Sequence, residues 1–235
     1  GKRGRKLFMK KYTTLLFDAD NTLLDFDACE KEALKKTFEA YNCPLRDDMK
    51  KRYMEINHAL WKSYEKGEIS REEVIYTRFG KLFEEFGIPL DGVEFEDTYQ
   101  DELGKSHELV EHAMDVILQL KQYHDLYIVT NGVSATQYSR LKDSGLDQHF
   151  KDIFVSEEVG YRKPMKEYFS YCFDKIGDLD KEKTLIIGDS LSSDIKGGNN
   201  AGIATCWYNP KKQEKSDDYH VTHEIEDLRE LLELV

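Results

Sequence analysis

Residues 13–24, Thr-Thr-Leu-Leu-Phe-Asp-Ala-Asp-Asn-Thr-Leu-Leu, decide the fold. The first part, residues 13–17, is a short, β-prone and largely apolar run, which predicts a buried parallel strand. Asp18 and Asp20 follow that strand, and turn-favouring polar residues come next. In an open α/β sheet, ligands bind in the crevice at the carboxyl ends of the strands, where a nucleophilic carboxylate would be useful. A strand followed by an ordinary Asp/Asn-rich turn is the alternative that this stretch alone leaves open.

The composition restricts both the size and the partners of the protein. A chain of 235 residues, 40% hydrophobic and 12% aromatic, fits one large domain or a core domain with a smaller partner. The net charge of -12 argues against a nucleic-acid polymer or an anionic membrane as partner. A metal ion and one lysine could still bind a small anionic substrate. No apolar run approaches the roughly 20 residues of a membrane span.

The cysteines and the first residues bear on where the protein works. The four cysteines form no Cys-x-x-Cys pair, which indicates reduced thiols of a cytoplasmic protein rather than a disulfide framework. Residues 1–8 are basic in an otherwise acidic chain. We interpret them as a leader, either an addition from cloning or a disordered segment, ahead of a natural start at Met9.

Residues 25–106 contain no convincing strand, and their apolar residues recur at helical spacing. The predicted helices cover residues 26–42, 47–66, 71–86 and 94–105. Ser70 and Glu73 form a capping-box signature at the start of the third of these. A block of four helices directly after a first strand indicates a separate, all-helical module.

Strands and helices alternate beyond residue 106, which predicts βαβ units and a parallel sheet. Strands are expected at 126–130, 153–156, 184–187 and 204–207, and helices at 109–123, 134–144, 164–176 and 192–200. Together with the first strand, they predict an α/β fold with a Rossmann-like parallel sheet and an inserted helical module.

Polar groups follow two further strands of this predicted sheet. Thr130 ends the second strand and precedes Asn131, so a hydroxyl and the free N–H groups of a helix start could bind phosphate oxygens. Lys163 precedes Pro164, which suits the first position of a helix, and would supply a point charge for a phosphoryl group. A plain N-cap region and a solvated lysine are the alternatives.

The candidate metal ligands come mainly from the fourth strand. It is followed by Asp189, whose carboxylate suits Mg2+, and five residues later by Asp194. Asp194 could orient the loop or Lys163, or be an ordinary exposed carboxylate on a helix. The seven histidines offer no metal pair at helical spacing, and we expect His220 and His223 to be solvated.

The order of these motifs resembles that of the haloacid-dehalogenase (HAD) superfamily. Its four motifs are matched by Asp18-Ala-Asp20, Thr130, Lys163, and Gly188-Asp189 with Asp194. The resemblance covers essentially residues 9–235 and implies a catalytic core over 9–24 and 107–235 with a helical C1 cap over 25–106. Within the superfamily, residues 156–160 and 193–207 are most similar to the pyrimidine 5′-nucleotidases.

The resemblance implies a Mg2+-dependent phosphomonoester hydrolase, in particular a nucleoside 5′-monophosphate phosphatase. Asp18 would attack phosphorus to give an aspartyl-phosphate, and Asp20 would act as general acid and then as general base. The expected phosphate ligands are Thr130, Asn131 and Lys163. Mg2+ would be held by the side chains of Asp18 and Asp189 and by the main-chain carbonyl of Asp20.

Other functions stay open at this point. A phosphatase or phosphomutase for another small phosphometabolite, such as a sugar phosphate or phosphoglycolate, would share the four motifs. A 2-haloacid dehalogenase fits poorly, because halide departure needs neither Asp20 nor Asp189. A non-catalytic phosphometabolite-binding protein would usually lose an aspartate, and a scaffold protein fits least. We expect a monomer or weak homodimer whose partner is a small phosphorylated metabolite.

The helical module is expected to be a mobile lid that selects the substrate, because lids of this kind exclude water and order the reacting groups. His58, Trp61 and Tyr64 share one predicted helix and could meet a nucleobase. The alternative is that Trp61 and Tyr64 pack in the core of the lid itself.

Overall fold

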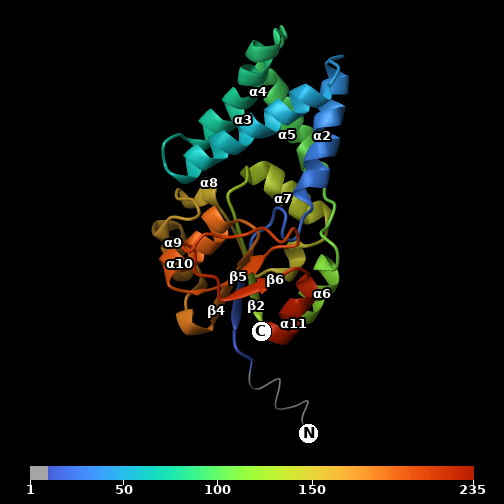
Figure 1. Ribbon diagram of the computed structural model, residues 1–235. Helices are drawn as coiled ribbons and strands as arrows, with labels where there is room; N and C mark the ends of the chain where they lie inside the picture. Colours follow the sequence, from blue (N-terminus) through green and yellow to red (C-terminus); the bar gives the residue numbers. More distant parts are fainter. Residues whose placement is uncertain (1–9) are drawn as a thin grey trace. The chain divides into compact units, whose positions relative to one another are not determined.

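The computed structural model describes residues 10–235, so the leader expected over 1–8 lies outside the described residues. The chain divides into two compact units. One contains residues 10–26 and His107–Val235 and holds the sheet, and the other, Asp27–Ser106, is helical (Figure 1). The helical unit begins two residues later than the module expected over 25–106 and ends at the same residue.

A six-stranded parallel sheet, with strand order β3-β2-β1-β4-β5-β6, forms the centre of the first unit. The strands are β1 (Thr14–Phe17), β2 (Asp125–Thr130), β3 (Asp152–Val155), β4 (Thr184–Gly188), β5 (Ala204–Tyr208) and β6 (His223–Ile225). The α/β fold with a Rossmann-like parallel sheet is thereby confirmed. In the register of β1, Phe17 pairs with Ile128 of β2 and Ile187 of β4, so the loops after these three strands leave the sheet side by side.

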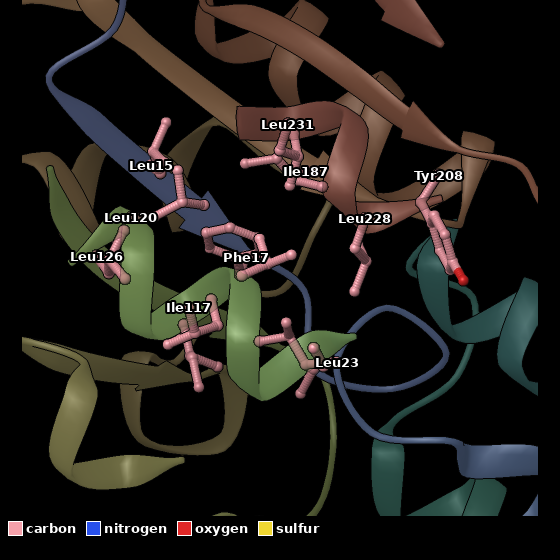
Figure 2. Packing of buried hydrophobic residues seen from close by; sticks show 14 of the residues in the cluster. Leu15, Phe17, Leu23, Ile117, Leu120, Leu126, Ile187, Tyr208, Leu228 and Leu231 are labelled. Carbon is pink, nitrogen blue, oxygen red and sulfur yellow. The ribbon is translucent and has the colours of Figure 1, made fainter. Parts of the chain in front are cut away.

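Helices cover both faces of this sheet (Figure 1). They are α6 (Ala113–Leu120), α7 (Ser134–Asp143), α8 (Ser156–Val159), α9 (Lys166–Ile176), α10 (Lys196–Ala201) and α11 (Leu231–Leu234), with short turns η1 (Asp147–His149), η2 (Lys181–Lys183), η3 (Leu191–Ile195) and η4 (Leu228–Glu230). Successive residues of β1 face opposite sides. Leu15 packs with Ile117 of α6 and Leu231 of α11 (Figure 2), whereas Leu16 packs with Phe169 of α9. Burial on both faces fixes the strand that leads into Asp18.

The helical unit consists of four helices whose bounds agree with the predicted ones to within two residues. They are α2 (Phe26–Ala40), α3 (Asp47–Glu65), α4 (Arg71–Phe86) and α5 (Gly92–Gly104). The predicted capping box is present, because the Ser70 side chain accepts from the Glu73 N–H and the Glu73 side chain accepts from the Ser70 N–H. Aromatic rings fill the interior, where Phe79 stacks on Tyr53 at a centroid distance of 4.9 Å.

A buried ion pair also joins the helices of this unit. Arg78 of α4 donates to both carboxylate oxygens of Glu96 on α5, at 2.6 and 2.9 Å, and to Oδ1 of Asn57 on α3 at 2.9 Å. Such a bidentate contact is geometrically specific. Because both charged side chains are buried, loss of either partner would leave an uncompensated charge in the interior.

Two predicted helix starts are wrong. The helix expected over 109–123 is only Ala113–Leu120, because Leu109 forms an isolated bridge with Leu24 and His112 has a left-handed φ of 68°. Pro164 is not a first helical residue either. It follows a cis peptide bond, and α9 begins two residues later, after an extended Met165.

Two features in the last part of the chain differ from the prediction. The helix expected over 192–200 starts as the π-turn η3 and continues as α10. The sixth strand was not predicted at all. It contains His223, which is half-buried and whose Nε2 lies 2.8 Å from the hydroxyl oxygen of Tyr12, so His223 is only partly solvated. His220 is exposed.

The four cysteines, Cys29, Cys43, Cys172 and Cys206, all carry free thiols. Burial raises the pKa of the Cys172 and Cys206 thiols to about 12, so these two are held as neutral thiols rather than thiolates. Across residues 10–235, no helix is both long enough and apolar enough to cross a bilayer.

Two glycines of the helical unit give a matched test of its packing. A Cβ at Gly92 would lie well inside 3.0 Å of the Gly80 backbone, whereas a Cβ at Gly80 would meet nothing within 4 Å. We expect Gly92→Ala to lower the free energy of unfolding by about 1–3 kcal/mol through overpacking. Gly80→Ala, inside a helix, should raise it by about 0.5–1 kcal/mol. Denaturant melts of both variants check this, and equal effects would contradict the packing described.

Candidate active site

The carboxylate of Asp18 lies directly beyond β1, a strand whose residues are all buried. Its backbone N–H donates to the carbonyl of Ile187 at 2.9 Å, so the main chain continues the β1–β4 pairing past the end of β1. One carboxylate oxygen accepts from the ammonium of Lys163 at 2.9 Å. The other lies 3.4 Å from the Thr22 hydroxyl, which also lies 3.4 Å from Oδ1 of Asp189. Asp18 therefore has one oxygen toward a cation and one toward a second carboxylate.

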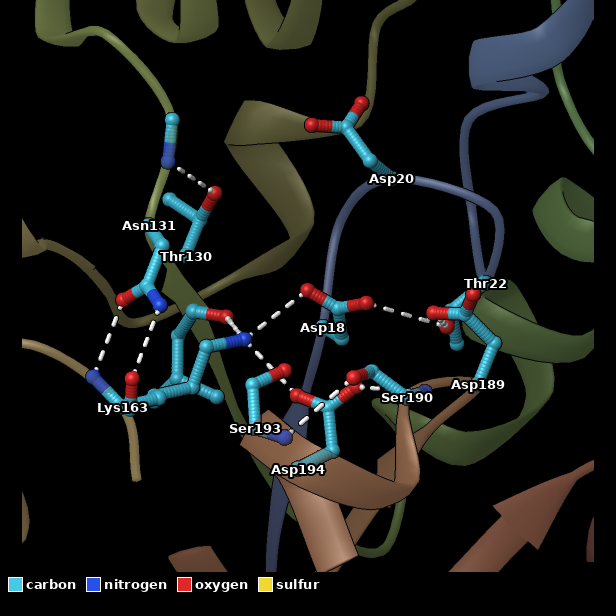
Figure 3. A network of polar contacts seen from close by, with 12 residues as sticks. Asp18, Asp20, Thr22, Thr130, Asn131, Lys163, Asp189, Ser190, Ser193 and Asp194 are labelled. Atoms are coloured by element: carbon cyan, nitrogen blue, oxygen red, sulfur yellow. Dashed lines mark hydrogen bonds and ion pairs between the residues drawn. The ribbon is translucent and has the colours of Figure 1, made fainter. Parts of the chain in front are cut away.

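The Lys163 ammonium is buried and uses all three of its donors (Figure 3). Besides Asp18 it contacts Oδ1 of Asp194 at 2.7 Å and the carbonyl of Val129 at 2.9 Å. The Asn131 amide pairs with both the N–H and the carbonyl of Lys163, each at 3.0 Å, and fixes its backbone. Burial alone would favour the neutral amine, but Asp18 and Asp194 outweigh it and raise the Lys163 pKa above its ordinary value.

The end of β4 is built around close packing of Gly188 on Asp194. A Cβ at Gly188 would overlap the Asp194 carboxylate, so only glycine leaves room for it. That carboxylate also accepts from the Ser190 N–H at 3.1 Å. With both oxygens engaged, Asp194 orients Lys163 and the loop. The indole N–H of buried Trp207 donates to the backbone carbonyl of Asp189 at 3.0 Å, which positions the neighbouring carboxylate.

Three carboxylates gather here, and two of them contact Lys163. Asp18, Asp189 and Asp194 each offer an oxygen within 4.8 Å of the others. Burial raises the pKa of Asp18 and of Asp194 to about 7, and that of Asp189 to about 6, although Lys163 opposes each shift. The donor set consists of oxygens, carries more negative than positive charge, and leaves Asp189 without a lysine contact. These properties fit a hard divalent cation such as Mg2+.

Asp20 takes part in a different set of contacts. Its carboxylate points away from the contact between Asp18 and Lys163 (Figure 3). Oδ1 accepts from Nη1 of Arg140 at 2.5 Å, and Oδ2 accepts from Nε2 of Gln137 at 3.0 Å. The same Gln137 nitrogen donates to the Thr130 hydroxyl at 2.8 Å. Asp20 and Thr130 are therefore joined through one amide on α7.

The core motifs expected from the sequence thus lie at neighbouring strand ends of one unit. Asn131 lies there as well, with its side chain committed to Lys163 rather than directed at a ligand. The candidate selectivity residues lie on α3 of the helical unit: His58 is exposed, Trp61 is half-buried, and Tyr64 is buried against it with ring centroids 5.4 Å apart.

Four site residues were not identified from the sequence. They are Thr22, Gln137, Arg140 and Trp207. For two of them a signal existed: Gln137 and Arg140 are polar residues three apart on the helix that follows Thr130, and so share one of its faces. The sequence marks Thr22 only as a turn residue, and it marks Trp207 only as part of a buried strand and of the stretch that resembles the pyrimidine 5′-nucleotidases.

Comparison with known proteins agrees with this geometry. The family model of the haloacid dehalogenase-like hydrolases matches residues 15–208, which include every one of the strand-end groups described above. The chain belongs to this family. It is therefore an enzyme of the HAD-like hydrolase class.

Relatives of this HAD-like hydrolase match it over nearly the whole chain. The HAD-hydrolase YfnB of Bacillus subtilis is 52% identical, with 97% of each chain covered. Its crystal structure, bound to magnesium and described as revealing interdomain movement, has a TM-score of 0.92 and covers 96% of this chain and 99% of that one. The pyrimidine 5′-nucleotidases PynA of Streptococcus pneumoniae and YjjG of Escherichia coli are 41% and 31% identical, covering 94% and 96% of this chain and 94% and 98% of their own.

The crowded carboxylates predict an unusual pH dependence of stability. The Asp18 pKa rises from 3.8 to about 7 on folding, so between these values the native protein holds a proton that the unfolded chain has lost. The free energy of unfolding therefore falls as pH rises through this window. Asp18→Asn removes that dependence. In chelator-treated protein, the melting temperature of the variant minus that of the wild type should therefore be larger at pH 8 than at pH 5.

The matched control for this measurement is Asp174→Asn, which changes an exposed carboxylate on α9. It should follow the wild-type pH profile. A melting-temperature difference between Asp18→Asn and wild type that stays constant from pH 5 to pH 8 would contradict the crowding of charge described here.

Proposed function

We propose that this HAD-like hydrolase is a Mg2+-dependent phosphomonoesterase of the cytoplasm that acts on nucleoside 5′-monophosphates, pyrimidines preferred. The observation that carries the proposal is the buried Asp18–Lys163 contact beside Asp189, with Asp20 on the same loop as Asp18. The kinship with PynA and YjjG supports the choice of substrate class.

The metal fits the carboxylate group of the site. The side chains of Asp18 and Asp189 and the main-chain carbonyl of Asp20 would hold Mg2+, which when bound supplies positive charge beside the phosphoryl oxygens. Asp194 is not needed as a ligand, because its two oxygens already accept from Lys163 and from the Ser190 N–H.

Asp18 suits the role of nucleophile. It is held on a strand end that cannot shift without disturbing β1, and its bond to phosphorus would give an aspartyl-phosphate as the leaving oxygen departs. The Lys163 ammonium next to it would stabilise the growing negative charge of the phosphoryl oxygens. The Thr130 hydroxyl, which accepts from Gln137, keeps its own proton to donate to a phosphoryl oxygen.

Asp20 suits proton transfer better than nucleophilic attack. Its side chain is about a quarter exposed, at 28%, whereas that of Asp18 is 11% exposed. It would protonate the leaving oxygen in the first step and take a proton from water when the aspartyl-phosphate is hydrolysed. The two aspartates then divide the chemistry, one forming the covalent bond and the other moving protons.

The test is a phosphate-release panel of nucleotides and sugar phosphates, with Mg2+ and with a chelator. We expect dUMP and dTMP to give the highest kcat/KM, activity to require Mg2+, and Asp18→Asn to abolish turnover with the fold intact. Asp20→Asn should slow turnover by about two to four orders of magnitude. The exposed Asp174→Asn should retain wild-type rates.

Specific results would refute parts of this proposal. Wild-type turnover in Asp18→Asn would exclude the proposed nucleophile. Much higher kcat/KM for hexose phosphates than for dUMP and dTMP would remove the nucleotide assignment while leaving phosphatase chemistry. A requirement for a bisphosphate, with phosphate retained on the product, would indicate a phosphomutase.

The helical unit is proposed as a mobile lid that selects the substrate, in line with the interdomain movement described for YfnB. Its candidate base-contacting residue is Trp61, which is half-buried. His58, exposed on the same helix, could add a polar contact. Tyr64 is 6% exposed and packs against Trp61 inside the unit. This position fits the alternative in which Tyr64 belongs to the core of the lid.

Trp61→Ala separates base recognition from packing. If the ring stacks on a base, kcat/KM should fall about tenfold or more for dUMP, since such stacking is worth about 1–3 kcal/mol, and stay near wild type for p-nitrophenyl phosphate. The melting temperature should not change. Tyr76→Ala, an exposed aromatic of the same unit, is the matched control. Equal losses on both substrates with a lowered melting temperature would make Trp61 a packing residue only.

A further inference from the structure

Two buried polar residues of α7 contact the proposed proton-transfer group, and no role toward Asp20 has been assigned to either of them so far. The side chain of Arg140 is 0% exposed and Gln137 is 2% exposed. Burying a guanidinium is costly unless it is paired and hydrogen-bonded. The buried Arg140 is paired with Asp20, a carboxylate that is itself partly exposed. We therefore look for a functional role of this pair in addition to any contribution to stability.

The geometry of the contacts is that of a clamp. Each oxygen of Asp20 accepts from a different side chain, Oδ1 from Arg140 at 2.5 Å and Oδ2 from Gln137 at 3.0 Å. Arg140 and Gln137 are themselves joined, because Nη1 donates to Oε1 of Gln137 at 2.8 Å. Two donors that are fixed to each other leave the carboxylate little rotational freedom.

The clamp is held in place from two further sides. The Arg140 guanidinium carbon lies 5.5 Å from the centre of the Phe26 ring, a cation–π distance. Gln137 donates to the Thr130 hydroxyl at 2.8 Å, which links the clamp to the end of β2. Thr130 belongs to the sheet-containing unit, and Phe26 is the residue of that unit at which α2 begins.

We propose that Arg140 and Gln137 are positioning residues that orient the Asp20 carboxyl group for proton transfer to the leaving oxygen. The carboxyl group carries the proton at the start of the step, and the carboxylate that remains after the transfer accepts from both side chains. The proposal rests on the proposed function, since it needs Asp20 to act as the general acid. It assigns a role to two residues that would otherwise be interpreted as ordinary buried polar groups of a helix.

The chemistry gives this role a specific signature. A nucleoside is a poor leaving group and needs a proton as the phosphorus–oxygen bond breaks, whereas p-nitrophenolate leaves largely without one. Loss of a residue that positions the general acid should therefore slow the nucleotide reaction selectively. Loss of a residue that only supports the fold should slow both reactions alike.

The experiment is a double-mutant cycle between Arg140→Gln and Asp20→Asn, measured as kcat/KM for dUMP and for p-nitrophenyl phosphate. Arg140→Gln should lower kcat/KM for dUMP by about 10- to 100-fold, a part of the full value of general acid catalysis. The loss on p-nitrophenyl phosphate should be below about threefold. In the Asp20→Asn background, Arg140→Gln should have no further effect on dUMP.

A matched control and a milder variant accompany the cycle. Lys142→Gln removes the same charge from an exposed position of the same helix and should stay within about twofold of wild type on both substrates. Arg140→Lys keeps the buried charge, so it should fall between wild type and Arg140→Gln with the same selectivity for dUMP. It also provides the measurement if Arg140→Gln proves unfolded by circular dichroism.

The outcomes separate this inference from the proposed function. Equal losses on both substrates, or an undiminished effect of Arg140→Gln in the Asp20→Asn background, would overturn the positioning role while leaving phosphatase activity established. Wild-type protein that releases no phosphate from any phosphomonoester with Mg2+ would overturn the proposed function, and the positioning role with it. That failure is visible without any variant.

Discussion

The site depends on one buried ammonium group. Lys163 contacts a carboxylate from the β1 loop, a carboxylate from η3 and a carbonyl of β2, so three segments far apart in sequence meet at its three protons. A buried charge of this kind is tolerated only when its partners are in place. The same requirement therefore fixes the end of β2, the loop after β1 and the turn after β4.

Placing three carboxylates close together in the interior lowers the stability of the fold. Burial makes the carboxylates of Asp18, Asp189 and Asp194 harder to ionise than they would be in water, and it raises their pKa values although Lys163 opposes each shift. The well-packed parts of the sheet compensate, because Leu15 and Leu16 of β1 are fully buried on opposite faces. A local conflict of charge within an otherwise consistent fold is a common property of functional sites.

Strong local patterns made most of this predictable from the sequence. Buried strands ending in polar residues located Asp18, Thr130 and Asp189, and helical periodicity located α2–α5 to within two residues. Parallel strand order then implied that these side chains share one edge of the sheet. The fold and the core of the candidate site follow from such signals, because each strand or helix pattern depends only on residues that are close together in the sequence.

The missed features depend on tertiary contacts instead. The pairing of Arg140 with Asp20 spans 120 residues, and no local pattern encodes it. The shortened start of α6 results from the bridge between Leu109 and Leu24. Strand β6 has only three residues, too few to show an alternating pattern, so the sequence gives no sign that His223 belongs to a strand. Side-chain orientation and edge strands are thus the parts that required the structure.

The central place of β1 in the sheet has a consequence for biosynthesis. The strand that leads into Asp18, the proposed nucleophile, is made before its neighbours β2 and β4, and Asp18 and Lys163 are 145 residues apart. Thr22 and Asp189 are 167 residues apart. Pairings of such long range are slow to form, whereas the intervening helices fold through local contacts. Asp18 is therefore synthesised long before its site partners, and the contacts of the candidate site can form only after the ribosome has released the residues up to Asp194.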